Sequence, residues 1–163
     1  MEDLQLRLLD PTTDLDLFRC AYDWRSTPKR HTQPTRMSFE TFTDTDPTQT
    51  VVGLFNGELQ AVYLLHEYQP YHFDVHMTSD RAAPRENVLE GARRVLRCLF
   101  EGGAKEVSAL IVARNYPLRH FVEAIGMRRV SRMRFSSCVD VSKGDSIQPR
   151  NQRTFVKYAA TRG

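Results

Sequence analysis

Residues 107–127 read Val-Ser-Ala-Leu-Ile-Val-Ala-Arg-Asn-Tyr-Pro-Leu-Arg-His-Phe-Val-Glu-Ala-Ile-Gly-Met, and this stretch decides the fold. Residues 107–113 are apolar on both faces of an extended chain, which indicates a central strand covered on both sides. Residues 115–125 have the apolar spacing of a helix, with an inward face made of Leu118, Phe121, Val122 and Ile125. Gly126 is typical of a helix end. The sequence therefore predicts a buried strand followed at once by an amphipathic helix.

A longer amphipathic helix precedes this strand. Pro84 suits the first helical position, and Gly102 and Gly103 suit the end. Between them one helical stripe collects the apolar side chains Val88, Leu89, Ala92, Val95, Leu96, Leu99 and Phe100.

A β-meander is predicted before that helix. Asn56-Gly57 separates two apolar runs, 50–55 and 58–65, and this dipeptide favours a two-residue hairpin turn because both positions need a positive φ. Residues 71–78 alternate strictly between apolar and polar side chains, as in a half-buried strand.

The remaining elements complete the prediction. A strand is expected at 4–9, helices at 15–26 and 38–45, a strand at 128–141, a polar loop at 142–152 and a last strand at 154–159. The order is β-α-α-β-β-β-α-β-α-β-β. It predicts an α/β (α+β) fold in one domain over residues 1–163, with a mixed central sheet of six to seven strands and helices on both faces.

Composition excludes several classes of protein. The chain has 163 residues, 40% of them hydrophobic and 26% charged, unlike disordered or collagen-like chains. The N-terminus has no pattern of a signal peptide, no run is long enough for a membrane span, and the odd number of cysteines is typical of a reducing compartment. A cytoplasmic location is expected.

The charge is divided unevenly along the chain. Residues 1–80 carry 6 Lys and Arg against 13 Asp and Glu, whereas residues 81–163 carry 17 against 7. This asymmetry favours an anionic ligand or partner for the second half.

Residues 98–127 carry a family resemblance. Asn115 is followed by Leu118 three residues on, by Phe121 six on and by Gly126 eleven on, and this spacing resembles the last motif of the GNAT superfamily of N-acetyltransferases. Residues 98–112 are also similar to that family where its long helix leads into the central strand. The resemblance implies an acetyl-CoA-binding half at about 71–135 and acceptor-side or partner-side loops at 27–37 and 142–152. It implies that the cofactor is acetyl-CoA, and the residues expected to bind it are Arg81, Arg85, Val112 and Asn115.

Two positions depart from the family pattern. The phosphate-binding turn reads Arg81-Ala-Ala-Pro-Arg-Glu86 without the family's glycines, and Pro84 has no N–H to give a phosphate. A helix N-terminus still attracts phosphate through its free N–H groups. Many members place a Tyr as general acid seven residues after the Asn, where this chain has Val122, which should slow the reaction.

Candidate bases lie on and beside the predicted strand at 71–78. His72, Asp74 and His76 share one face of it, and Glu67 lies near the end of the preceding strand. An acetyltransferase needs a base to deprotonate an ammonium group, and these side chains are suited to it. The alternatives are a solvated strand face and a metal site.

Four arginines follow the motif of residues 115–127. Arg128, Arg129, Arg132 and Arg134 favour an acidic or macromolecular protein partner, a homo-oligomer or an assembly, or else form a solvated face. Nucleic acid is disfavoured, because no helix-turn-helix pattern and no interleaved stacking aromatics accompany them.

Two hypotheses about function follow. The first is a GNAT-type N-acetyltransferase that transfers an acetyl group from acetyl-CoA to an amine of a small molecule or protein. The second is a catalytically degenerate GNAT-like protein with a structural or assembly role. The looser motif is also similar to GNAT-like proteins of tailed bacteriophages, which implies the host cytoplasm or the virion as its location.

Overall fold

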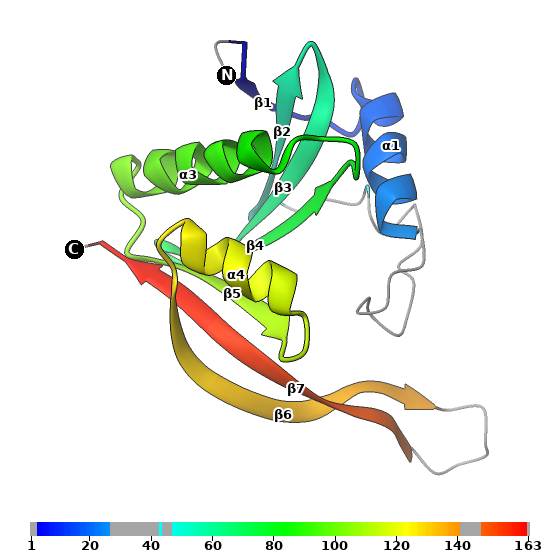
Figure 1. Ribbon diagram of the computed structural model, residues 1–163, viewed down its shortest axis with the longest axis vertical. Coiled ribbons are helices and arrows are strands. Elements are labelled where there is room, and N and C mark those ends of the chain that lie inside the picture. The colour runs from blue at the N-terminus through cyan, green and yellow to red at the C-terminus, as the bar shows by residue number, and fades with distance from the viewer. Residues whose placement is uncertain (1–2, 27–42, 44–46, 141–147, 163) are drawn as a thin grey trace.

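The computed structural model describes residues 3–26, 43, 47–140 and 148–162. In chain order its elements are β1 (Gln5–Leu8), α1 (Leu15–Ser26), β2 (Gln49–Asn56), β3 (Glu58–Gln69), β4 (His72–Ser79), α3 (Arg85–Glu101), β5 (Glu106–Val112), α4 (Tyr116–Ala124), β6 (Arg128–Asp140) and β7 (Gln148–Thr161) (Figure 1).

One mixed sheet of seven strands, ordered β1-β2-β3-β4-β5-β7-β6, runs through the molecule. Strands β1 to β4 form an antiparallel meander, and the predicted hairpin joins β2 to β3. Its turn differs from the expected one: Gly57 has a φ of 75°, but Asn56 has no positive φ and still pairs with Glu58, because a register shift between Leu54 and Phe55 leaves Gly57 alone between the strands. The pairing of β4 with β5 is parallel, because α3 connects them as a crossover. The predicted fold class is therefore confirmed, and the sheet has seven strands.

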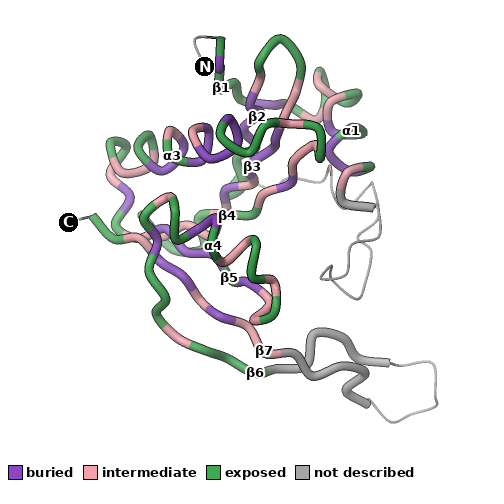
Figure 2. Tube along the Cα trace, in the orientation of Figure 1, coloured by how far each residue is buried: buried purple, intermediate pink, exposed green. Residues whose placement is uncertain are grey.

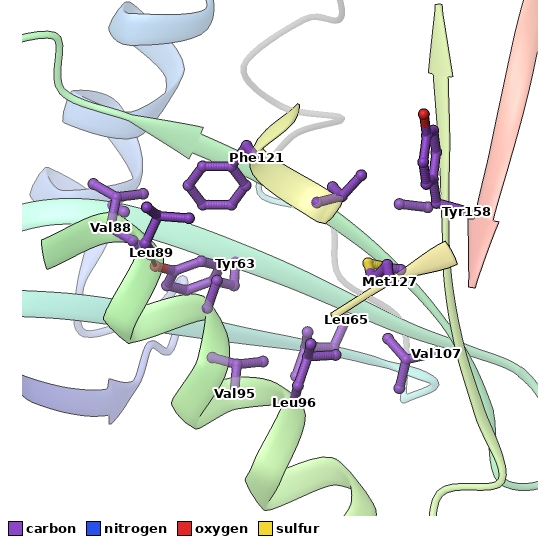
Figure 3. Packing of buried hydrophobic residues seen from close by; sticks show 14 of the residues in the cluster. Tyr63, Leu65, Val88, Leu89, Val95, Leu96, Val107, Phe121, Met127 and Tyr158 are labelled. Carbon is purple, nitrogen blue, oxygen red and sulfur yellow. Dashed lines mark hydrogen bonds between the residues drawn. The ribbon is translucent and has the colours of Figure 1, made fainter. Parts of the chain in front are cut away.

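The helices cover both faces of the sheet. Buried side chains of α3 and α4 pack with Tyr63, Leu65, Val107 and Tyr158 in the larger core cluster (Figure 3). Phe18, Ala21 and Tyr22 of α1 pack on the opposite face, against β2 and β3. The outward side of α3 is exposed along its length, as its amphipathic sequence predicts (Figure 2). Among the described residues, no helix is long and apolar enough to cross a membrane.

Two further local predictions are corrected. The loop expected at 142–152 is shorter, because β7 begins at Gln148, opposite Asp140 of β6. The polar side chains there do not prevent a strand, since the ladder is made by the backbone. Pro84 is the N-cap of α3 and not its first helical residue, because its ψ of 129° is extended. The expected loop 27–37 lies outside the described residues, as does the expected helix 38–45 except for Thr43.

Candidate active site at the fork between β4 and β5

The parallel strands β4 and β5 are paired over only part of their length. Their register runs from His72 opposite Glu106 to Asp74 opposite Ser108. Both strands are described to their ends, and β4 continues to Ser79 while β5 continues to Val112. Their arrowheads diverge in Figure 1. We call the opened region, residues 75–79 and 109–112, the fork.

The wall of the fork formed by β4 carries backbone groups available for pairing. The Phe73 carbonyl accepts a hydrogen bond from Ser108 Oγ at 3.3 Å, so this carbonyl is directed toward β5. Backbone groups of a strand alternate in direction, and the N–H and C=O of Val75 and Met77 therefore point the same way, into the fork. An extended ligand placed there has donors and acceptors to pair with.

Asp74 lies at the closed end of the fork. Ser108 is 2% exposed, and its hydroxyl donates to Asp74 Oδ1 at 2.6 Å. Asp74 itself is half-buried. Its strand neighbours Phe73 and Val75 face the core under α3 and α4, so Asp74 faces the opposite side of the sheet. The result is a carboxylate held in a fixed position beside the point where the strands separate.

The N-terminus of α3 follows the open end of β4. Two N–H groups of the preceding turn are satisfied within it, since Ala82 N donates to Asp80 Oδ1 at 3.0 Å and Ala83 N donates to the Asp80 carbonyl at 3.1 Å. No side chain of a described residue caps the helix. Among the described residues, the N–H groups of Arg85 and Glu86 find no acceptor. These free donors, together with the positive end of the helix dipole, form a site for an anion.

Solved structures of acetyltransferases share this architecture. An N-acetyltransferase from Staphylococcus aureus Mu50 superposes with a TM-score of 0.75 at 12% identity, covering 97% of each chain. An acetyltransferase of the GNAT family from Streptococcus pneumoniae gives 0.70 at 11% identity, covering 97% of this chain and 99% of that one. The ribosomal-protein-S18-alanine N-acetyltransferase from Escherichia coli gives 0.71 at 14% identity, covering 97% and 93%.

The chain has the GNAT fold. No protein-family model and no curated protein sequence matches it. At these identities the likeness establishes the fold, and it gives no support to the hypothesis of a phage-type assembly protein.

The GNAT fold places the residues of the 115–127 motif at the end of β5. Val112 ends β5 and is half-buried on the face shared with Asp74, because it is four residues beyond Ser108. The Asn115 side chain caps α4 by accepting from Leu118 N at 3.3 Å. Val122 is buried in the core. Its side chain has no proton to donate.

The candidate bases do not all lie at the fork. His76 is exposed, two residues beyond Asp74 on the same face and beside the fork. His72 lies two residues before Asp74, where β4 and β5 are still paired, and its Nδ1 is 3.0 Å from the Pro70 carbonyl oxygen. Glu67 is paired with Phe73, so it lies on the α3 side of the sheet, away from Asp74. The arrangement brings Asp74 and His76 to the fork and leaves His72 and Glu67 outside it.

Two further residues lie beside Asp74 that no sequence motif marks. His66 is the cross-strand partner of Asp74, and Ser108 is its hydrogen-bond donor. The sequence signal for Ser108 is that it is a small polar residue inside the otherwise apolar run 107–113. His66 could be found only from the β3–β4 register, which has an irregularity between Glu67 and Gln69. Within the described part of the chain, no group of three or more His, Cys, Asp or Glu could hold a metal ion.

Proposed function

We propose that this protein is an N-acetyltransferase that transfers the acetyl group of acetyl-CoA to an amine of a small molecule or protein. The observation that carries the proposal is the fork, because it offers backbone groups that no described strand pairs with, beside a fixed carboxylate, and leads toward a helix N-terminus that no described side chain caps. The same combination supports acetyl-CoA as the ligand. An extended amide chain pairs with Val75 and Met77, and a pyrophosphate fits the N–H groups of Arg85 and Glu86.

Arg81 and Arg85 are the proposed phosphate ligands. Both are exposed, and within the described residues neither forms an ion pair. Their charges compensate for the missing glycines of the turn and for the missing N–H of Pro84. Val112 and Asn115 flank the far side of the fork.

Asp74 is the proposed general base. The amine reaches the fork from the face on which Asp74 lies, and it must lose a proton before its nitrogen attacks the acetyl carbon. The Asp74 carboxylate accepts that proton. As the C–N bond then forms and the carbon–sulfur bond breaks, CoA leaves as the thiolate, and the second proton of the nitrogen passes to the thiolate or to water, which leaves the neutral amide. Because Val122 has no proton to donate, the thiolate departs without a general acid from that position. Bound acetyl-CoA supplies the activated acyl group, and this chain supplies position and the base.

The direct test is release of free CoA thiol from acetyl-CoA in the presence of a panel of primary amines. The panel holds a polyamine, an amino sugar and peptides with free α-amino groups. We expect thiol release that depends on one class of amine and on protein concentration. Release that no amine in the panel stimulates would contradict the proposal.

Replacing Arg81 and Arg85 together by Ala should raise the Kd of acetyl-CoA by about 100-fold, because each replacement removes a charge-assisted contact of about 1.5 kcal/mol. Isothermal titration calorimetry measures this. The matched control is the double variant Arg93→Ala/Arg97→Ala, which removes two other exposed arginines of α3. Its Kd for acetyl-CoA should stay within about twofold of the wild type. An equal loss in both double variants would assign the effect to net charge.

Ser108 is proposed as a positioning residue for Asp74. Ser108→Ala removes the 2.6 Å hydrogen bond and should lower kcat about tenfold at unchanged KM for acetyl-CoA, since the carboxylate loses its fixed orientation. Ser108→Thr keeps the hydroxyl and should restore most of kcat. If Thr and Ala at this position gave the same kcat, the hydroxyl would have no positioning role.

A further inference from the structure

The outer edge of β6 is one border of the sheet. In the strand order β6 stands last, next to β7, and no described strand pairs with its outer side. Backbone N–H and C=O groups along this side are therefore open to an added strand. The other border strand, β1, has only four residues, whereas β6 has 13.

The arginines of this edge have a defined arrangement. Arg129 is paired with Tyr158 and Arg132 with Val156, and both partners belong to the core cluster under the helices. Arg134 lies two residues beyond Arg132, so these three arginines share the face of the sheet that α3 and α4 cover. Arg128 points to the opposite face.

Their charge is not neutralised within the described chain. Residues 128–134 contain four arginines and no acidic residue, and none of the four forms an ion pair with a described residue. The proposed acetyl-CoA site does not explain them, because β7 and β5 separate β6 from the fork. Val130 is 60% exposed and Met133 is 37% exposed, which gives the edge apolar contacts as well.

We propose that the outer edge of β6 binds an extended acidic segment of a partner protein as an added strand. Carboxylates at every second position of the segment lie opposite Arg132 and Arg134, where the guanidinium groups can bind them with two hydrogen bonds each. The alternate positions are small or apolar and lie opposite Met133. A polypeptide is favoured over a nucleic acid, because only a polypeptide also pairs with the backbone edge.

The test uses two dye-labelled nonapeptides of equal composition, built from Glu, Thr and Val. In one the Glu residues alternate with Thr and Val, and in the other the Glu residues are clustered at one end. We expect fluorescence anisotropy to show that the alternating peptide binds at least about tenfold more tightly than the clustered one. Arg132→Glu should weaken that binding about tenfold. Arg97→Glu, an equal charge change on α3, should alter it by less than about twofold.

Three outcomes would overturn the proposal. The first is equal affinity for the two peptides, which would mean diffuse attraction without a strand register. The second is equal weakening by Arg132→Glu and Arg97→Glu. The third is tighter binding of a single-stranded oligonucleotide of the same charge as the peptide. Peptide binding needs no acetyl-CoA, so failure here is distinct from failure of the proposed acetyltransferase activity.

Discussion

Replacing Asp74 by Asn lowers kcat/KM for acetyl transfer by about 10²- to 10⁴-fold, the contribution expected of a general base. The amide keeps the shape of the side chain and can still contact Ser108, but it cannot take a proton from the attacking amine. The loss should appear in kcat, while the Kd of acetyl-CoA stays within about twofold of the wild type, because the proposed cofactor contacts lie on the fork backbone and on α3. Steady-state kinetics by thiol release and calorimetry with acetyl-CoA measure the two quantities on one preparation.

The matched control for this variant is Glu67→Gln. It makes the same carboxylate-to-amide change one strand away, but on the opposite face of the sheet. We expect its kcat to stay within about twofold of the wild type. Loss of activity in Glu67→Gln with full activity in Asp74→Asn would move the base to the other face and would contradict the assignment.

Gly91→Ala should destabilise the protein by about 2–3 kcal/mol, the upper part of the range of about 1–3 kcal/mol for overpacking in a core. A Cβ at this position would lie 2.5 Å from the Tyr63 hydroxyl oxygen and 2.8 Å from Leu54 Cδ2. Tyr63 cannot give way easily. It is 1% exposed, and its hydroxyl donates to the Val88 carbonyl at 2.8 Å. Burial also raises the pKa of Tyr63 well above its ordinary value, so the hydroxyl stays protonated as that donor at any pH at which the protein is used.

Thermal denaturation checks this prediction. For a chain of this length the expected loss corresponds to a fall in Tm of about 5–10 °C. Gly102→Ala is the control, because Gly102 has a φ of −77° and a Cβ there meets only backbone oxygens, that of Cys98 at 3.3 Å and that of Leu99 at 3.5 Å. Its Tm should change by no more than about 2 °C. A Gly91→Ala protein as stable as the wild type would show that α3 can move away from the sheet.

The elements themselves were predictable because their signals are local. Asn56-Gly57 fixes a hairpin turn, and the apolar stripes of α3 and α4 fix two helices, since each pattern lies within one short stretch of sequence. The length of β7 was not predictable from local polarity, because its first residues are held by backbone pairing with β6.

The site was harder to predict than the elements. The fork depends on where β4 and β5 stop pairing, and these strands are separated in sequence by a whole helix, so no local pattern marks it. The alternation of apolar and polar side chains over residues 71–78 was enough to place His72, Asp74 and His76 on one face of a strand. Which of them lie together depends on the register of β3 against β4, and this register puts His66, not Glu67, beside Asp74. The apolar pattern of residues 107–113 predicts a buried strand and no role for Ser108, although the Ser108 hydroxyl holds Asp74 in place.

The central claim is that the fork between β4 and β5 holds acetyl-CoA. The most direct test is an NMR titration of the ¹⁵N-labelled protein with acetyl-CoA, following the backbone amides of Val75, Met77, Arg85 and Glu86, with Leu6 of the distant strand β1 as reference. We predict that the four amides shift together and saturate with one Kd below about 1 mM, while Leu6 stays in place. Unchanged amide chemical shifts of Val75 and Met77 at 1 mM acetyl-CoA would contradict the claim that the fork holds acetyl-CoA.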